Sequence, residues 1–293
     1  MIYYIKRKDL NVVKYDACIA HSLQSRIYAL SWYLDIVADN WDVLVLNDYE
    51  AVMPIPWKQK YFIKYVTQPF FCQQLGVFTN QKGSKELTLN FIKKIPHKFF
   101  KISLQLNTEN YFNSDKLVTK NNYFLALNKT LPTLIANFSN NRKRDYKKAL
   151  AASLVIDKNI AAKDFFKFYL LNDKHYHKNT SIKNVLENIL NINNGHVKFY
   201  GIRSSGVLIA CVLLLYDKKR ITYLAPVHNK VSQKNGAATL LITIIIKEYE
   251  GSDYILDFEG SMIKGVASFY KSFGSSQIDY YRFSANAIKR AFF

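Results

Sequence analysis

The chain has 293 residues, of which 49% are hydrophobic and 22% charged, and its 41 Lys and Arg against 22 Asp and Glu give a formal net charge of +19. At about 150 residues per domain, this length predicts two domains. The composition excludes a disordered chain, and no apolar run reaches the roughly 20 residues that a membrane-spanning helix needs. The first residues carry their charge after the apolar ones, unlike a signal peptide, so we expect a cytoplasmic protein without stable membrane insertion.

The first half of the chain alternates helix-like and strand-like segments. Apolar residues at helical spacing predict a helix over 25–37. Pro54 and Pro56 place their strand near an edge of the sheet or end it early, because proline cannot donate to a strand ladder. Thr130 is the predicted cap, and Pro132 a first-turn residue, of the helix that closes this half. The other predicted elements are strands at 41–46, 50–57, 61–66, 101–106 and 123–127 and a helix at 84–95.

The second half predicts antiparallel hairpins followed by a β-α-β-α-β run. Ser181 is the predicted cap of an amphipathic helix that stops at residues 193–195, and a polar loop extends to Asn235. This order of elements is typical of a mixed α/β layer fold. The other predicted elements are helices at 165–171, 237–249 and 263–272 and strands at 196–203, 207–216, 221–226, 254–258 and 277–283.

The domain boundary must come from the order of elements, because no linker rich in Pro, Gly or Ser separates two halves. The predicted boundary between the domains falls near residues 128–140, where a polar stretch leads into a basic cluster. We therefore expect an N-terminal domain over 1–134 and a C-terminal domain over 135–293.

The cysteines and histidines give no sign of a metal site. Cys18, Cys72 and Cys211 lie far apart without metal-ligand spacing and read as reduced thiols. His175 and His177 are two residues apart, so on a helix they point about 200° apart and cannot share a metal ion. We expect no metal ion to be bound.

The positive charge has two interpretations. A basic surface attracts polyanions such as RNA, nucleotide phosphates or anionic lipid head groups. Alternatively, the joint abundance of Lys, Asn, Ile, Tyr and Phe is what an AT-rich genome produces without selection for binding. Only residues 142–148 form a dense basic cluster. Arg142, Arg144 and Lys148 are candidates for binding a nucleotide or tRNA phosphate, or else form a solvated helix face.

A strand-to-helix junction near Gly236 carries the clearest chemical signal. Gly236 and the two alanines after it remove side chains where the chain turns, which leaves main-chain N–H groups unshielded at a helix N-terminus. The helix dipole adds partial positive charge, so such a turn binds phosphate oxygens. The simpler alternative is close packing of a helix on a sheet. The candidate donor-binding residues are Gln233, Lys234, Asn235, Gly236, Ala237 and Ala238.

Two motifs resemble the GNAT superfamily of N-acyltransferases. Gln233-x-x-Gly236-x-Ala238 is similar to the Gln/Arg-x-x-Gly-x-Gly/Ala loop, and Tyr270, four residues before Gly274, resembles the GNAT tyrosine that faces the thioester. The resemblance implies that acyl-CoA is the donor, with its pyrophosphate at the loop. It also implies that the main chain near 225–227 stabilises the oxyanion.

The whole chain resembles the Fem-like branch, whose members carry two GNAT-like domains. The resemblance rests on segments 240–241, 257–261 and 269–274, and on a basic helix at 141–150 that follows a short strand, as at the Fem domain junction. It implies an α/β fold of two GNAT-like domains, each a mixed, mostly antiparallel sheet flanked by helices. The C-terminal domain would hold donor and catalysis, and the N-terminal domain the acceptor. The long helical-arm insertion of some Fem proteins is missing.

Four residues near the end of the chain are the candidate catalytic groups. Asp257 and Glu259 alternate with Phe258 on a predicted strand, so both carboxylates would project from one face and accept the amine proton. A solvated strand edge or ion pairs with lysines are the alternatives. Tyr270 would protonate the leaving group, or else pack between helix and sheet. Lys271 would contact a donor phosphate or the oxyanion, or else face solvent.

The N-terminal half offers a cluster of glutamines among aromatic residues. Gln68, Gln73 and Gln74 are candidates for binding a substrate, because an amide both donates and accepts hydrogen bonds. The alternative is that they pair with strand ends and turns.

These observations lead to one functional prediction with two alternatives. We expect an N-acyltransferase that moves an acyl group from acyl-CoA to a primary amine. The first alternative is a Fem-like transferase that uses aminoacyl-tRNA and acts on a cell-wall precursor peptide. The second is a GNAT-fold binding module without catalysis, because a fold does not imply activity.

Overall fold

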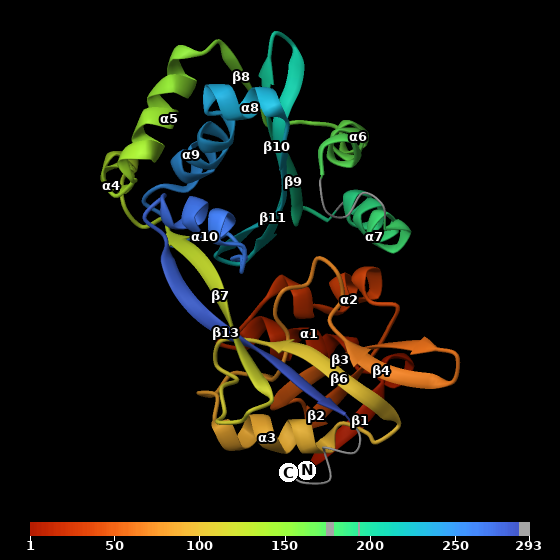
Figure 1. Cartoon of the computed structure of the whole chain (residues 1–293). Helices are drawn as coiled ribbons and strands as arrows, with labels where there is room; N and C mark the ends of the chain where they lie inside the picture. The colour runs from red at the N-terminus through yellow and green to blue at the C-terminus, as the bar shows by residue number, and fades with distance from the viewer. Residues whose placement is uncertain (174–178, 193, 287–293) are drawn as a thin grey trace. The chain divides into compact units, whose positions relative to one another are not determined.

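A computed structural model describes residues 1–173, 179–192 and 194–286 (Figure 1). The chain forms two compact units. Unit 1 comprises Met1–Lys120 and the C-terminal segment from Asp279, and unit 2 comprises Asn121–Ile278. His175, His177 and Asn193, which entered the sequence analysis, lie outside the described residues.

The limits of the two units differ from the predicted 1–134 and 135–293 in two places. Residues 121–134 belong to unit 2, because the end of one strand, β7 (Leu117–Ala126), pairs with β12 (Ile255–Asp257). The last strand, β13 (Ser276–Asn286), pairs from Tyr281 onward with β6 (Phe99–Leu106) of unit 1. Sequence order alone does not reveal such a return of the C-terminus to the first unit.

Unit 1 is a mixed sheet flanked by helices. Its strands are ordered β1-β2-β3-β4-β6-β13, with β5 paired to β3, and only β4 and β6 run parallel within this path. Its elements are β1 (Ile2–Lys6), α1 (Val12–His21), α2 (Ser31–Val37), β2 (Asn40–Leu46), β3 (Ala51–Lys60), β4 (Ile63–Thr67), β5 (Phe78–Thr79), α3 (Lys85–Lys94) and β6, with 3₁₀ turns at Arg7–Asp9 and Ile27–Ala29.

One local prediction for this unit was wrong, and a second, the edge position of the two prolines, holds only locally. The expected helix over 25–37 is a 3₁₀ turn followed by α2, because Leu30 is extended and the Asp16 carboxylate accepts hydrogen bonds from the N–H and hydroxyl of Ser31. The strand with Pro54 and Pro56 is internal to the sheet and continues to Lys60. It tolerates the prolines because on its second side β5 pairs only at 51–52 and β4 only from residue 57.

Unit 2 is a second mixed sheet, ordered β7-β12-β11-β10-β9-β8. All its neighbouring strands are antiparallel except β11 and β12. Its further elements are α4 (Leu131–Ala136), α5 (Asn140–Ala151), β8 (Leu154–Asp157), α6 (Ala162–Asn172), α7 (Thr180–Leu190), β9 (Val197–Ser204), β10 (Val207–Asp217), β11 (Arg220–His228), α8 (Lys230–Asn235), α9 (Ala237–Tyr249) and α10 (Lys264–Lys271). The predicted fold class, with mostly antiparallel mixed sheets flanked by helices, is confirmed.

Local structure in unit 2 departs from the sequence-based expectation at three points. The expected polar loop to Asn235 contains a short helix, α8, whose first turn is capped by the Asn229 side chain. Asn179, rather than Ser181, caps α7. β12 ends at Asp257, so Glu259 is not on the strand.

The separation of β11 from β12 positions the main cavity of unit 2. These strands pair only over Arg220–Thr222 and Ile255–Asp257, while β11 continues to His228. A bulge interrupts the pairing of β11 with β10 beside Leu224 and bends the strand. Helices α8 and α9 follow β11, and α10 follows β12. The first turns of α9 and α10 both border the cavity at this point.

Candidate functional site

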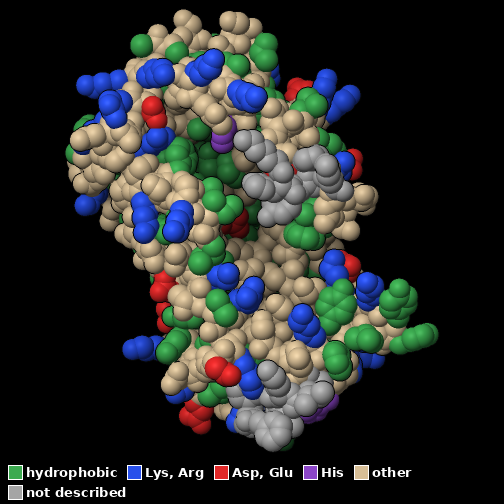
Figure 2. Space-filling view, in the orientation of Figure 1, with side chains coloured by type: hydrophobic (Ala, Val, Ile, Leu, Met, Phe, Trp, Pro, Cys, Tyr) green, Lys and Arg blue, Asp and Glu red, His purple; other side chains and the backbone are tan. Residues whose placement is uncertain are grey.

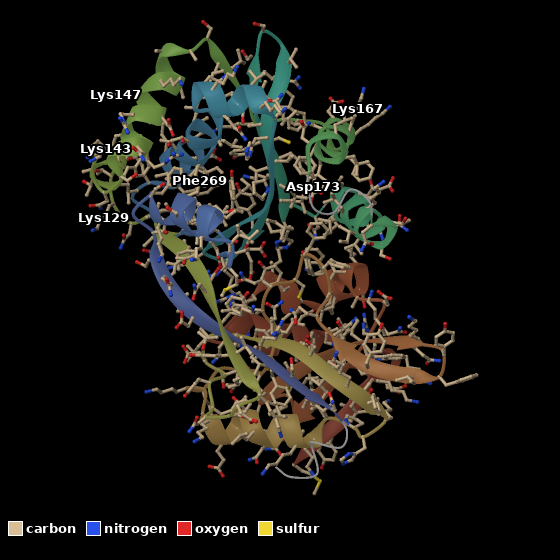
Figure 3. The ribbon with its side chains drawn as sticks, in the orientation of Figure 1. Lys129, Lys143, Lys147, Lys167, Asp173 and Phe269 are labelled. Carbon is tan, nitrogen blue, oxygen red and sulfur yellow. The ribbon has the colours of Figure 1, made fainter. Side chains whose placement is uncertain are left out.

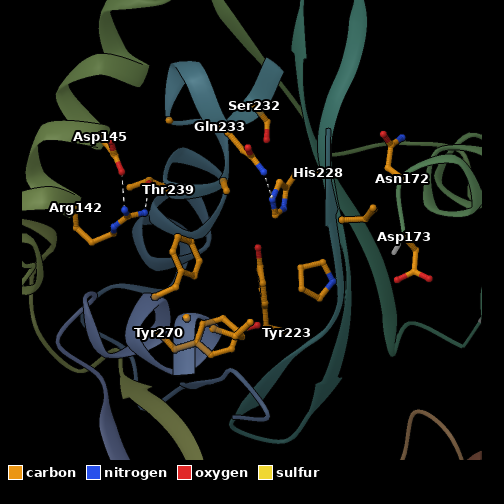
Figure 4. Close-up of a pocket in the computed structure, with 17 residues that line it drawn as sticks. Arg142, Asp145, Asn172, Asp173, Tyr223, His228, Ser232, Gln233, Thr239 and Tyr270 are labelled. Carbon is orange, nitrogen blue, oxygen red and sulfur yellow. Dashed lines mark hydrogen bonds and ion pairs between the residues drawn. The ribbon is translucent and has the colours of Figure 1, made fainter. Parts of the chain in front are cut away.

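A cavity of about 560 Å³ opens in unit 2 where β11 and β12 separate. Its walls come from α5, the end of α6, the second half of β11, α8 and the first turn of α9, and α10 (Figure 4). Hydrophobic side chains line much of the hollow (Figure 2). All the lining residues belong to one unit, so the site is built by a single compact body.

The N-terminus of α9 borders this cavity, but fewer of its amides are available than the sequence suggests. Gly236 has φ 74°, and its N–H bonds the Ser232 carbonyl as the C-cap of α8. The N–H of Ala237 bonds Asn235 Oδ1 at 3.3 Å. Within the described residues, this leaves the amides of Ala238 and Thr239 for a ligand, and both residues line the cavity.

The glycine at this turn is required by packing as well as by backbone conformation. A Cβ atom on Gly236 would lie 2.3 Å from the carbonyl oxygen of Asp145 and 3.3 Å from Ala149 Cβ, both on α5. A left-handed φ already disfavours other residues here. Close packing, the simpler interpretation of the small residues, therefore accounts for part of this motif.

Of the six candidate donor-binding residues, three line the cavity: Gln233, Gly236 and Ala238. Lys234 is solvent-exposed on α8, and Ala237 is fully buried beneath the turn. Asn235 contributes the cap for Ala237 rather than a cavity wall.

Arg142 brings a buried positive charge to the same place. Its side chain is 13% exposed, its Nη1 donates to Thr239 Oγ1 at 2.6 Å, and its Nη2 pairs with Asp145 Oδ2 at 2.5 Å. The guanidinium lies 4.7 Å from the centre of the Phe269 ring. Burial lowers the pKa of Arg142 and Asp145 opposes this, but an arginine stays protonated at neutral pH. Its buried Nε has no hydrogen-bond partner among the described residues.

Arg144, the other candidate arginine, does not line the cavity. It lies on the exposed side of α5, where Nη2 donates to Asn141 Oδ1. The two arginines are two residues apart on a helix and therefore lie on different faces.

Tyr270 lies in the wall of the cavity, and Lys271 does not. The Tyr270 ring stacks on Phe258 with centres 4.7 Å apart and meets Tyr223 edge-on at 6.4 Å. Burial, with a smaller contribution from the negative charge of Glu259, raises the pKa of Tyr270, so its hydroxyl keeps its proton at neutral pH. Lys271 is instead exposed, with Nζ 5.4 Å from the Tyr123 ring.

The two candidate carboxylates do not project side by side into the cavity. Asp257 is 2% exposed; Oδ2 pairs with Arg220 at 2.5 Å, and Oδ1 accepts the Asn122 side chain and the Glu259 N–H, each at 2.9 Å. Glu259 follows the strand with φ 57°, so the expected alternation about Phe258 does not hold. Neither residue lines the cavity.

The three glutamines lie in unit 1 and form hydrogen bonds with other residues of that unit. Gln68 Nε2 donates to the Cys72 carbonyl at 2.7 Å, and Gln68 Oε1 accepts the Gln105 N–H at 3.0 Å. The fully buried Gln74 donates to Gln73 Oε1 at 2.7 Å. These bonds match the alternative of pairing with strand ends and turns.

Several cavity residues were missed by sequence reasoning. His228, at the end of β11, lies 3.5 Å from Gln233 Nε2 through its Nε2 atom. Asn172 and Asp173 reach the cavity from the end of α6, beyond the ribbon of β11 as seen from Arg142 (Figure 4). Ser232, Thr239 and Phe269 also line the cavity, and each adjoins a residue of a predicted motif. His228, Asn172 and Asp173 carry no local signal, because tertiary packing brings α6 to this strand.

The fold is the Fem-like arrangement of two GNAT-like domains, as the sequence motifs predicted. No protein-family model and no curated protein matches the chain.

Three solved structures illustrate the likeness. FemX has a TM-score of 0.69 at 12% identity, covering 93% of this chain and 96% of FemX. A tandem GNAT protein from the clavulanic acid biosynthesis pathway has a TM-score of 0.55 at 10% identity, covering 98% and 99%. The C-terminal domain of a putative lysylphosphatidylglycerol synthetase from Agrobacterium fabrum has a TM-score of 0.56 at 10% identity, covering 96% and 93%.

Neither a metal-binding cluster nor a membrane-spanning helix is present among the described residues. No group of three or more His, Cys, Asp or Glu side chains in the described ranges is arranged to hold a metal ion. In the same part of the chain, no helix combines the length and hydropathy needed to cross a bilayer.

Proposed function

We propose that unit 2 is the catalytic part of a transferase that moves an acyl group from acyl-CoA to a primary amine. The observation that carries the proposal is a cavity at the separated ends of β11 and β12 that is bordered by a helix N-terminus, a buried arginine and a buried tyrosine. This one cavity would therefore bind the donor, supply a general acid and give the acceptor amine access to the carbonyl carbon.

The donor would bind through its phosphates at the first turn of α9. The amides of Ala238 and Thr239, together with the partial positive charge of the helix end, favour an anion there. Arg142 adds a full charge whose burial strengthens its attraction for a phosphate. Asp145 already neutralises part of that charge, so the donor would compete with Asp145 for the guanidinium.

The acceptor amine would enter from the side of Asn172 and Asp173. The Asp173 carboxylate favours an approaching ammonium group, and an imidazole such as that of His228 can accept its proton near neutral pH. This proposal replaces Asp257 and Glu259 as the base, because Asp257 is engaged by three donors and neither lines the cavity.

In the transfer itself, the amine nitrogen bonds to the acyl carbon and the carbonyl oxygen becomes an oxyanion. Near 225–227, however, Pro226 has no N–H, and the N–H groups of Ala225 and Val227 point toward β10, as does that of Asn229, which donates to the Ile209 carbonyl. The oxyanion would therefore need a donor from another part of the cavity wall. The carbon–sulfur bond then breaks, and the Tyr270 hydroxyl gives its proton to the departing thiolate, while the second proton of the amine nitrogen returns to the Tyr270 oxygen, directly or through water.

A second candidate donor, aminoacyl-tRNA, is favoured by the arrangement of α5. This helix covers Gly236, which reduces the space beside the phosphate-binding turn. Its outer side carries Lys143, Arg144, Lys147 and Lys148, and Figure 3 shows Lys143 and Lys147 pointing outward. A row of cations of this kind suits the phosphates of a polynucleotide.

The test is a thermal-shift screen against acetyl-CoA, longer acyl-CoAs and bulk tRNA. A donor at about 100 times its dissociation constant adds about 2.7 kcal/mol of stability. Ala238→Asp should abolish the shift by acyl-CoA, because it places a carboxylate beside the two amides at a helix position where Asp is well tolerated. Ala238→Asn is the matched neutral control and should keep most of the shift.

Each remaining outcome decides against the acyl-CoA proposal. An equal shift in wild type and Ala238→Asp would put the donor elsewhere. A shift by tRNA alone, weakening steeply with salt and lost in a variant with Lys143, Arg144, Lys147 and Lys148 all changed to Gln, would favour aminoacyl-tRNA. No shift by any donor, with no transfer activity, would leave a binding module.

A further inference from the structure

The β3–β4 hairpin of unit 1 ends in three exposed hydrophobic residues. Tyr61 is 82% exposed, Phe62 97% and Ile63 55%, and we call these three the hairpin tip. The loop has two residues, since Lys60 pairs with Ile63. Tyr61 has φ 53°, a conformation that favours Gly or Asn in such turns. An aromatic residue therefore occupies a position that the backbone conformation disfavours, although its ring gains nothing from burial.

A third exposed aromatic residue lies beside the tip along one groove. β4 pairs in parallel with β6, and the register skips Phe100, which bulges outward and is 52% exposed. A groove of about 470 Å³ is lined by Tyr61, Ile63, Tyr65 and Phe100 together with Lys60 and Lys101. Lys60 and Lys101 therefore border the same groove as these four hydrophobic residues, and Phe62 lies at the tip beside it.

The two segments that form this surface carry charges of one sign. Residues 58–66 and 97–103 contain five lysines and no Asp or Glu. Lys58 is paired with Asp39, whereas Lys60 and Lys64 have their Nζ atoms 5.9 Å and 4.8 Å from the rings of Tyr61 and Trp57. Lys60 and Lys64 therefore hold their ammonium groups over aromatic rings, and aromatic and basic residues together are typical of surfaces that meet a lipid head-group layer.

We propose that the hairpin tip docks unit 1 on the surface of an anionic phospholipid bilayer. Phe62 and its neighbours would enter the interfacial region, and Lys60, Lys64 and Lys101 would contact head-group phosphates. A protruding tip with an aliphatic residue suits insertion better than base stacking, which needs rings displayed on a flat or concave surface. A second copy of the chain would bring like charges together.

The test is co-sedimentation of the full chain with vesicles of phosphatidylcholine alone or with about 30% phosphatidylglycerol. Wild type should bind the anionic vesicles and lose binding as salt rises. Phe62→Ser should weaken partitioning at least tenfold, and Phe62→Trp should retain it. Changing Lys60 and Lys101 to Gln should weaken partitioning by about 25-fold, since each lysine near the surface contributes about fivefold.

Matched control variants distinguish binding through this surface from nonspecific hydrophobic adsorption and from attraction by the overall positive charge. Val13→Ser removes an 80% exposed hydrophobic residue on α1, and Lys93→Gln with Lys94→Gln removes two charges at the end of α3; both should bind vesicles as wild type does. The proposal is overturned if Phe62→Ser partitions like wild type. It is also overturned if Phe62→Ser changes the sedimentation mass without lipid, or weakens binding of single-stranded RNA while wild type ignores vesicles.

Discussion

Nη1 of Arg142 donates a hydrogen bond to Oγ1 of Thr239 at 2.6 Å, which joins the first half of α5 to the first turn of α9. The same guanidinium lies over Phe269 of α10. One side chain thus connects three of the helices around the cavity and holds a positive charge beside the amides of α9.

Arg142→Gln should weaken binding of the anionic donor by about 10- to 100-fold, because charge-assisted hydrogen bonds contribute about 1.5–3 kcal/mol. The affinity for donor, measured by calorimetry, checks this. Arg144→Gln is the matched control on the same helix: it removes an exposed arginine and should leave acyl-CoA affinity unchanged. Equal affinities in wild type and Arg142→Gln would exclude the guanidinium from the donor site.

Tyr270→Phe should lower the transfer rate by about 10²- to 10⁴-fold, the range for losing a general acid. The ring keeps its stacking on Phe258, so the melting temperature should change little. Tyr200→Phe removes a hydroxyl that donates to Glu248 outside the cavity, and it should leave the rate intact. A Tyr270→Phe enzyme with wild-type kcat would rule out proton donation by this residue.

Gly236→Ala should destabilise unit 2 by more than the cost of its backbone conformation. The new Cβ would meet the Asp145 carbonyl at 2.3 Å, so α5 must shift. Gly206→Ala is the matched control: its φ is 78°, but nothing lies within 4 Å of its Cβ position. Urea denaturation should place Gly206→Ala about 1–2 kcal/mol below wild type and Gly236→Ala clearly lower. Equal losses would mean that α5 does not press on this turn.

The sequence anticipated the parts of the site that have local signals. Helix α9 begins and ends at the predicted residues, and two separate motifs brought Gly236 and Tyr270 to one cavity. The GNAT-like, Fem-like fold was predicted from the same segments.

Long-range packing accounts for what the sequence did not reveal. Nothing local indicates that α5 lies on Gly236 or that α6 brings Asp173 to β11. The alternation around Phe258 predicted that the carboxylates of Asp257 and Glu259 share one face of a strand. This prediction was wrong, because Glu259 has a left-handed backbone conformation that ends the alternation. Alternation predicts faces only while the backbone stays extended.

Asp257→Asn distinguishes a structural carboxylate from a catalytic base. The substitution leaves the partly buried Arg220, whose side chain is 20% exposed, without its counter-charge. Breaking one partner of a fully buried pair costs about 3–5 kcal/mol, so a loss toward the lower end of that range is expected here. We therefore expect a large fall in urea stability but nearly wild-type kcat per folded molecule. Replacing Arg220 by Met in the same chain should restore much of the stability, because no unpaired charge remains. A stable Asp257→Asn protein with a transfer rate reduced 100-fold or more would instead return Asp257 to the role of base.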